Sequence, residues 1–168
     1  VEEAARVAKI PEIRMIEFDS LEHGYRPEKF AYNICPILKI CEEHHLIVKV
    51  FTGQGFYTMP EQWLYYSKQY PNVQFVIEHL GGSDYAYGTV DLCKEKENAN
   101  LMLETSYETE VPSLNRAFSE LPSDRFLYGS NYPSNFTKLS ILKYNSLNLS
   151  EDLMNKMFYE NAKKLLGI

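Results

Sequence analysis

Residues 73–83 read VQFVIEHLGGS, a short apolar run that ends in a histidine and is followed by two glycines. A run of this length, rich in β-branched and aromatic residues and closed by a turn signal, predicts a buried strand over residues 73–79. Four further runs of the same kind predict strands, at residues 13–18, 46–51, 101–106 and 126–130. We therefore expect five strands.

Longer segments with helical spacing separate and follow these runs. They cover residues 27–45, 60–70, 85–97, 112–121, 139–147 and 151–166. Helix starts are marked by Pro60 before an acidic first turn and by Ser150 before two acids. Strands that alternate with helices predict parallel pairing in an α/β fold, with helices flanking the sheet.

Clusters of glycine and polar residues follow three of the predicted strands. They read TGQG at residues 52–55, LGGS at 80–83 and NYPSN at 131–135. In parallel α/β folds, the loops after the carboxyl ends of the strands build the active site. The sequence therefore places its polar and glycine residues where a site is expected.

Composition limits the classes of function. The chain has 168 residues, which we expect to form one domain over residues 1–168, and 17 Lys and Arg against 23 Asp and Glu. This acidic balance argues against nucleic-acid binding. No apolar run reaches the roughly 18 residues of a membrane span, and residues 1–10 do not resemble a signal peptide. With three cysteines, an odd number, we expect reduced thiols and a cytoplasmic location.

The number of strands leaves two architectures open. Five βα units in 168 residues take about 34 residues each, and eight such units need about 270, a usual length for a (β/α)8 barrel. The chain fits either an open five-stranded sheet or five eighths of a barrel.

Three motifs in a fixed order narrow this choice. They are IEHLGG at residues 77–82, DRFLYGSNYP at 124–133 and YENAKKLLG at 159–167. Together they resemble the amidohydrolase-related family of metal-dependent TIM-barrel hydrolases and decarboxylases, whose fifth strand is similar to IVKVFTG at 47–53. The resemblance covers about residues 12–168. It implies the C-terminal five βα units of a TIM barrel, incomplete as a lone chain.

The resemblance also implies one divalent metal ion, often zinc, at the C-terminal rim of the barrel. The family's ligands are an H-x-H pair on the first strand, a histidine on the fifth and an aspartate on the eighth. In this chain Phe51 occupies the fifth-strand position and Asn131 the eighth, and no H-x-H occurs. We therefore expect a degenerate site with no metal ligand assigned, and zinc or manganese only where other residues rebuild it.

His79 is the candidate catalytic residue, because it matches the sixth-strand histidine that acts on water or substrate in this family. The alternative is a histidine that only hydrogen-bonds a neighbouring strand and orients its loop. Asn131 is a candidate substrate-binding residue through its side-chain amide. The alternative there is an asparagine that caps the loop before Pro133.

Three further residues are candidates for substrate binding. Asp19 and His23 follow the first predicted strand, where the alternative is a solvated loop. Glu104 ends the fourth strand, and strand alternation places it on the same face as Ser106. If that face points into the barrel, Glu104 is a buried carboxylate with a raised pKa.

Two functions follow as hypotheses. The first is a hydrolase, or a decarboxylase-like enzyme, that acts on a small carboxylate, lactone or amide at the barrel rim. The second is a catalytically inactive barrel fragment that serves as a binding or assembly module. Five strands leave two open sheet edges, so we also expect a homo-oligomer or an N-terminal segment that covers them.

Overall fold

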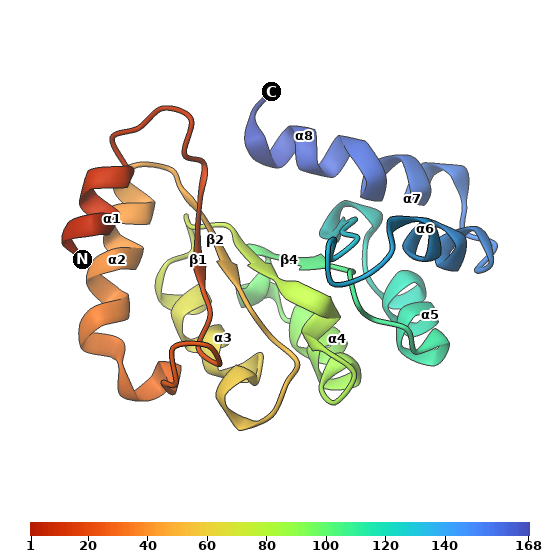
Figure 1. The fold of residues 1–168 in the computed structure, drawn as a ribbon, viewed down its shortest axis with the longest axis horizontal. Coiled ribbons are helices and arrows are strands. Elements are labelled where there is room, and N and C mark those ends of the chain that lie inside the picture. The colour runs from red at the N-terminus through yellow and green to blue at the C-terminus, as the bar shows by residue number, and fades with distance from the viewer.

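Five short parallel strands lie side by side in the computed structural model, which describes residues 1–168 (Figure 1). They are β1 (Met15–Phe18), β2 (Ile47–Val50), β3 (Phe75–Ile77), β4 (Leu101–Glu104) and β5 (Phe126–Leu127). Each strand pairs with the next in the order β1-β2-β3-β4-β5. The five predicted strands and their parallel pairing are confirmed. They are shorter than predicted, because the ends of the apolar runs lie outside the paired ladder, as at His79, which has φ 57°.

One helix precedes the strands, and the others connect or follow them. The helices are α1 (Glu2–Val7), α2 (Ala31–Glu43), α3 (Glu61–Gln69), α4 (Ala86–Lys94), α5 (Val111–Glu120), α6 (Thr137–Asn145), α7 (Glu151–Asn155) and α8 (Asn161–Leu166). The sequence does not predict α1. The helix predicted over residues 151–166 is divided by a π-helical turn at Lys156–Glu160. In this turn the carbonyl of Met157 accepts a hydrogen bond from the backbone N–H of Tyr128 at 2.8 Å, which ties the segment to the end of β5.

The main hydrophobic core lies between one face of the sheet and the helices. Strand residues of this face, such as Val48, Phe75 and Leu103, are completely buried against Leu38 of α2 and Trp63 of α3. A fully buried side chain of this size contributes roughly 1.5–3 kcal/mol to folding. Because 25 buried residues belong to this cluster, it provides most of the apolar stabilisation of the fold.

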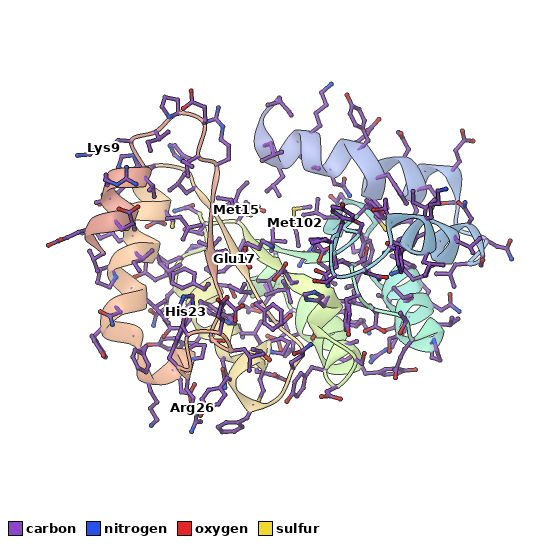
Figure 2. The ribbon with its side chains drawn as sticks, viewed as in Figure 1. Lys9, Met15, Glu17, His23, Arg26 and Met102 are labelled. Atoms are coloured by element: carbon purple, nitrogen blue, oxygen red, sulfur yellow. The ribbon has the colours of Figure 1, made fainter.

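The opposite face of the sheet changes from apolar to charged along the strands. Its apolar end is a cluster of four buried residues, Ile47, Val76, Met102 and Leu127, against which α8 packs. Figure 2 labels Met15, Glu17 and Met102 on this face. Toward the carboxyl ends, Lys49 Nζ lies 2.7 Å from Glu78 Oε1 and 3.2 Å from Glu17 Oε2.

The strand order decides between the two architectures left open by the sequence. A doubly wound open sheet reverses its strand order at one point and carries helices on both faces. Here the order never reverses, and the helices pack on one face except for α8, which covers only the apolar end of the other. This arrangement is that of successive βα units in a barrel. The outer edges of β1 and β5 have no partner strand in the chain, and how they are covered stays a prediction. None of the helices combines the length and apolar character needed to cross a bilayer.

Candidate functional site

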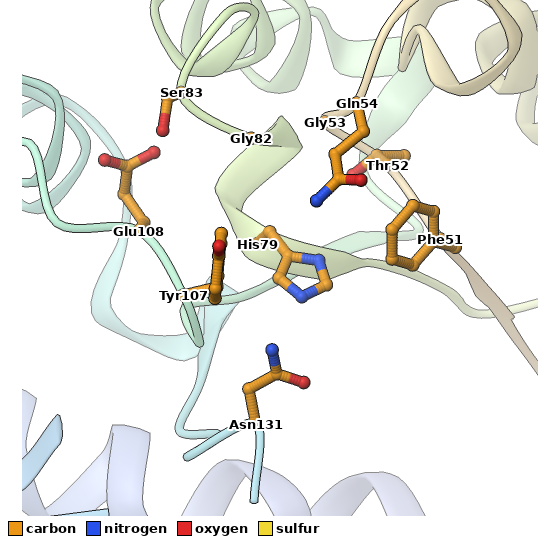
Figure 3. A pocket seen from close by; sticks show the side chains of 10 residues that line it. All are labelled: Phe51, Thr52, Gly53, Gln54, His79, Gly82, Ser83, Tyr107, Glu108 and Asn131. Carbon is orange, nitrogen blue, oxygen red and sulfur yellow. The ribbon is translucent and has the colours of Figure 1, made fainter. Parts of the chain in front are cut away.

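A cavity of about 70 Å³ opens at the carboxyl ends of the strands (Figure 3). The loops that follow β2, β3, β4 and β5 meet there. Its lining residues are Phe51, Thr52, Gly53, Gln54, His79, Gly82, Ser83, Tyr107, Glu108 and Asn131. The structure therefore brings two of the predicted site residues, His79 and Asn131, into one cavity.

His79 stands at the centre of this cavity. It is 6% exposed and adopts left-handed backbone angles immediately beyond β3. Its ring meets Phe51 edge to face at a centroid distance of 5.3 Å, and Tyr107 at 5.8 Å. The Nδ1 atom of His79 is buried and has no hydrogen-bond partner. A buried polar atom without a partner costs free energy, so this atom is a candidate contact for a ligand.

The protonation state of His79 follows from its surroundings. Burial lowers the pKa of His79 to about 4, because the charged imidazolium is poorly solvated there, and the positive charges of Lys49 and Lys143 add to the effect. The ring is therefore neutral at pH 7. A neutral imidazole with a free ring nitrogen can accept a proton.

Two side-chain amides flank the His79 ring. Figure 3 shows Gln54 and Asn131 on opposite sides of the imidazole, each with its amide pointing toward it. Asn131 has φ 54°, a left-handed conformation that asparagine tolerates better than most residues. The backbone of Gln54 is fixed by Thr58, whose hydroxyl accepts from the Gln54 N–H and donates to its carbonyl, both at 2.8 Å. The cavity thus offers amide donors and acceptors next to a neutral base.

Glu104 lies beside the backbone of His79. Its carboxylate accepts hydrogen bonds from the Ser106 N–H at 2.8 Å, the Ser106 hydroxyl at 2.7 Å and the His79 N–H at 3.4 Å. Burial raises the pKa of Glu104, in agreement with the sequence expectation. A Cβ atom at Gly129 would overlap this carboxylate. Glu104 therefore supports the His79 loop and does not line the cavity.

Asp19 and His23 lie elsewhere. The Asp19 carboxylate accepts from the backbone N–H groups of Leu21 and Glu22, and His23 Nδ1 is 2.7 Å from the Asp19 carbonyl oxygen. Both residues border a hollow beside β1 and α2, and Figure 2 shows His23 beyond the end of β1. The structure does not bring them to the His79 cavity, because the two side chains stabilise a local turn.

The sequence candidates leave out most of the cavity lining, including the polar side chains of Gln54, Tyr107 and Glu108. Gln54 belongs to the TGQG cluster, so its loop is predicted but not its side chain. Tyr107 and Glu108 lie in the loop between β4 and α5, which carries no glycine signal. These two residues lie near His79 because β3 and β4 are neighbours in the sheet. The sequence of the loop itself does not indicate this pairing.

A family model described as amidohydrolase matches residues 1–168. The chain belongs to the amidohydrolase family. The resemblance stated from the three sequence motifs is therefore confirmed. A search of curated proteins finds no match to the sequence.

Solved structures of TIM-barrel proteins share the fold of this family member. The 5-carboxyvanillate decarboxylase of Sphingomonas paucimobilis is 14% identical, with a TM-score of 0.75 over 99% of this chain and 62% of its own. A Pseudomonas putida protein assigned as a 2-pyrone-4,6-dicarboxylic acid hydrolase is 15% identical, with a TM-score of 0.75 over 98% of this chain and 67% of its own.

A third structure contains a metal ion. The 5-carboxyvanillate decarboxylase of Novosphingobium aromaticivorans, in complex with manganese and 4-hydroxy-3-methoxy-5-nitrobenzoic acid, is 16% identical with a TM-score of 0.72. It matches 99% of this chain and 60% of its own. The chain thus spans between 60 and 67% of the length of these three proteins, and the predicted partial TIM barrel is confirmed.

The metal centre of the amidohydrolase family requires several ligands in one place, and this chain does not supply them. No group of three or more His, Cys, Asp or Glu side chains lies close enough together to hold a metal ion. At the rim, Phe51 offers no donor atom and Asn131 offers only a neutral amide oxygen. The residues of this chain therefore do not fit the family's metal ion by themselves.

Replacement of Glu78 by glutamine is expected to change the pH dependence of stability. Burial raises the pKa of Glu78 from 4.5 to about 7. An acid whose pKa is raised on folding favours the folded state at low pH, and that stabilisation is lost as the pH rises through the raised pKa. Relative to the wild type, Glu78→Gln should gain about 2–3 kcal/mol of unfolding free energy between about pH 4 and pH 8.

Urea unfolding across this pH range measures the effect. Glu17→Gln is the matched control, because it also removes a partner of Lys49 but lies 47% exposed. We expect a difference of only a few tenths of a kcal/mol for the control. Equal pH dependence in the wild type and Glu78→Gln would show that Glu78 has no raised pKa.

Proposed function

We propose that this amidohydrolase-family chain forms the active-site rim of a hydrolase that acts on a small carboxylate, lactone or amide, with His79 as the general base. A decarboxylase-like reaction at the same site belongs to the same proposal. The observation that supports it most is the neutral His79 ring, which lies in a rim cavity between two side-chain amides and whose Nδ1 has no hydrogen-bond partner.

The chemistry of this proposal uses the residues of the chain. His79 accepts a proton from water as the water oxygen attacks the substrate carbonyl, and it returns the proton to the leaving alcohol or amine. An N–H group of one of the flanking amides, Asn131 or Gln54, donates to the carbonyl oxygen, where negative charge develops. Glu104 is a positioning residue for His79, through the backbone. Asp19 and His23 lie outside the cavity and have no part in this proposal.

The pH profile of kcat/KM tests the role of His79. Candidate substrates are small amides, lactones and carboxylates, assayed by product formation. Because the pKa of His79 is about 4, the base is unprotonated across the neutral range and the rate should fall only below about pH 5. An acid limb near pH 6.5, the ordinary value for histidine, would contradict a buried neutral base.

A second function is supported by Phe51. This apolar ring occupies the position of a family ligand and packs edge-on against His79. A binding module without turnover would use the same cavity, and its ligand would stabilise the fold by mass action. The two functions separate in one experiment, in which each compound is tested for thermal stabilisation and for conversion. Stabilisation without conversion across the panel favours the binding module, and conversion favours the hydrolase.

A further inference from the structure

One buried carboxylate in the rim cavity takes no part in the proposed reaction. Glu108 is 1% exposed and lines the cavity. Its Oε1 accepts the backbone N–H of Glu110 at 2.6 Å, but its Oε2 is buried without a partner. A buried carboxylate oxygen that lacks a donor is costly, and a ligand that brings a donor removes this cost. The unpartnered Oε2 of Glu108 is therefore a candidate acceptor for a donor group of the ligand.

The cavity offers no cation to a negatively charged ligand. None of its lining residues is a lysine or an arginine. The two lysines whose charge reaches His79 are already engaged. Lys49 pairs with Glu17 and Glu78, and the Lys143 ammonium donates to the carbonyl oxygens of Thr105 at 3.1 Å and of Glu108 at 2.7 Å.

The surroundings of Glu108 favour a positively charged group. Figure 3 shows Glu108 and Ser83 pointing toward one another on one side of the cavity, with the Tyr107 ring between Glu108 and His79. A carboxylate beside an aromatic ring binds an ammonium ion through charge and through the electron-rich ring face. The serine hydroxyl oxygen is a further acceptor for an ammonium N–H.

We propose that Glu108 and Tyr107 bind an ammonium group of the ligand, so that the site selects small amines over small carboxylates. The inference rests on the proposed function in that it uses the same cavity. The cavity, at about 70 Å³, has room for a small polar group but not for an aromatic ring of the ligand. For the hydrolase, selection of small amines narrows the proposed substrates to an amide or lactone that carries an amino group near the carbonyl, and it leaves out the small carboxylates.

The test compares propylammonium with propionate, two probes of similar size and opposite charge. Dissociation constants are measured by ligand-observed NMR titration at constant ionic strength. We expect propylammonium to bind at least roughly tenfold more tightly than propionate, the size of a hydrogen bond to a charged group. Equal binding, tighter binding of propionate, or no binding of either probe would overturn the proposal.

Two variants assign the preference to these residues. Glu108→Gln should abolish it, and glutamine keeps an oxygen that accepts the Glu110 N–H, so the loop is retained. Glu110→Gln is the matched control, because it removes an exposed carboxylate two residues away and should leave the preference intact. A preference that survives Glu108→Gln would overturn the proposal.

Tyr107→Leu gives a second measurement. Because Tyr107 is 50% exposed, this substitution should disturb the fold less than a change at a buried residue. It should weaken propylammonium binding roughly threefold and leave propionate binding unchanged. Equal weakening of both probes would count against ammonium binding. The amine preference and substrate turnover are measured separately. An amine preference without turnover supports this inference and contradicts the hydrolase. Turnover that depends on His79, without an amine preference, supports the hydrolase and contradicts this inference.

Discussion

Replacement of His79 by glutamine is expected to lower kcat/KM by roughly 10²–10⁴-fold, the usual contribution of a positioned general base. Glutamine fills much of the space of the imidazole and can hydrogen-bond, but it cannot accept a proton at neutral pH. Because the ring packs against Phe51 and Tyr107 and Glu104 holds this loop through the His79 backbone N–H, the fold should survive the change. Product formation and the urea midpoint, measured on the same preparation, separate loss of chemistry from loss of structure.

His44→Gln is the matched control for this variant. His44 is exposed and directly follows α2, away from the cavity. We expect activity within about twofold of the wild type, as for most surface substitutions. If His79→Gln kept the activity of the control, His79 would not be the base, and the binding module would become the better account.

Replacement of Gly82 by alanine should give the largest loss of stability in the rim. The loops after β2 and β3 touch through their backbones at Gly53 and Gly82, which both have positive φ. A Cβ atom on Gly82 would overlap the Cα of Gly53. Left-handed strain and overpacking each cost about 1–3 kcal/mol, so we expect a loss of roughly 3–5 kcal/mol in the free energy of unfolding.

Gly55→Ala isolates the contribution of the close contact. Gly55 also has positive φ, at 70°, but a Cβ atom there meets nothing within 4 Å. We expect a loss of only about 1 kcal/mol for this variant. Similar losses for Gly55→Ala and Gly82→Ala in urea unfolding would mean that the two loops are not in contact.

The strands and their buried faces were accessible from the sequence, because their pattern is local. The apolar run at residues 73–79 is sufficient to predict β3, and alternation correctly places Glu104 beside Ser106. His79 could be located because it ends a predicted strand at the rim and matches the sixth-strand histidine of the family that the motifs resemble. Its neutral state could not, since that depends on burial and on two lysines from other parts of the chain.

The cavity itself depends on contacts between distant segments. Gln54, His79 and Asn131 belong to three different loops, and only the strand order brings them together. Asp19 follows a strand in the same way as His79, yet its side chain is used by its own turn. A polar residue at a strand end is therefore a candidate, and long-range packing decides which candidates share a cavity.

We propose that this rim works through His79 and its flanking amides, without a metal centre held by this chain. Elemental analysis of metal content per chain, before and after addition of zinc and manganese, tests it most directly. After dialysis we predict far less than one ion per chain, because Phe51 offers no donor atom, Asn131 offers only a neutral amide oxygen, and no three His, Cys, Asp or Glu side chains gather to hold an ion. About one tightly held ion per chain, lost on Asn131→Ala, would contradict the claim and restore metal-dependent chemistry to this site.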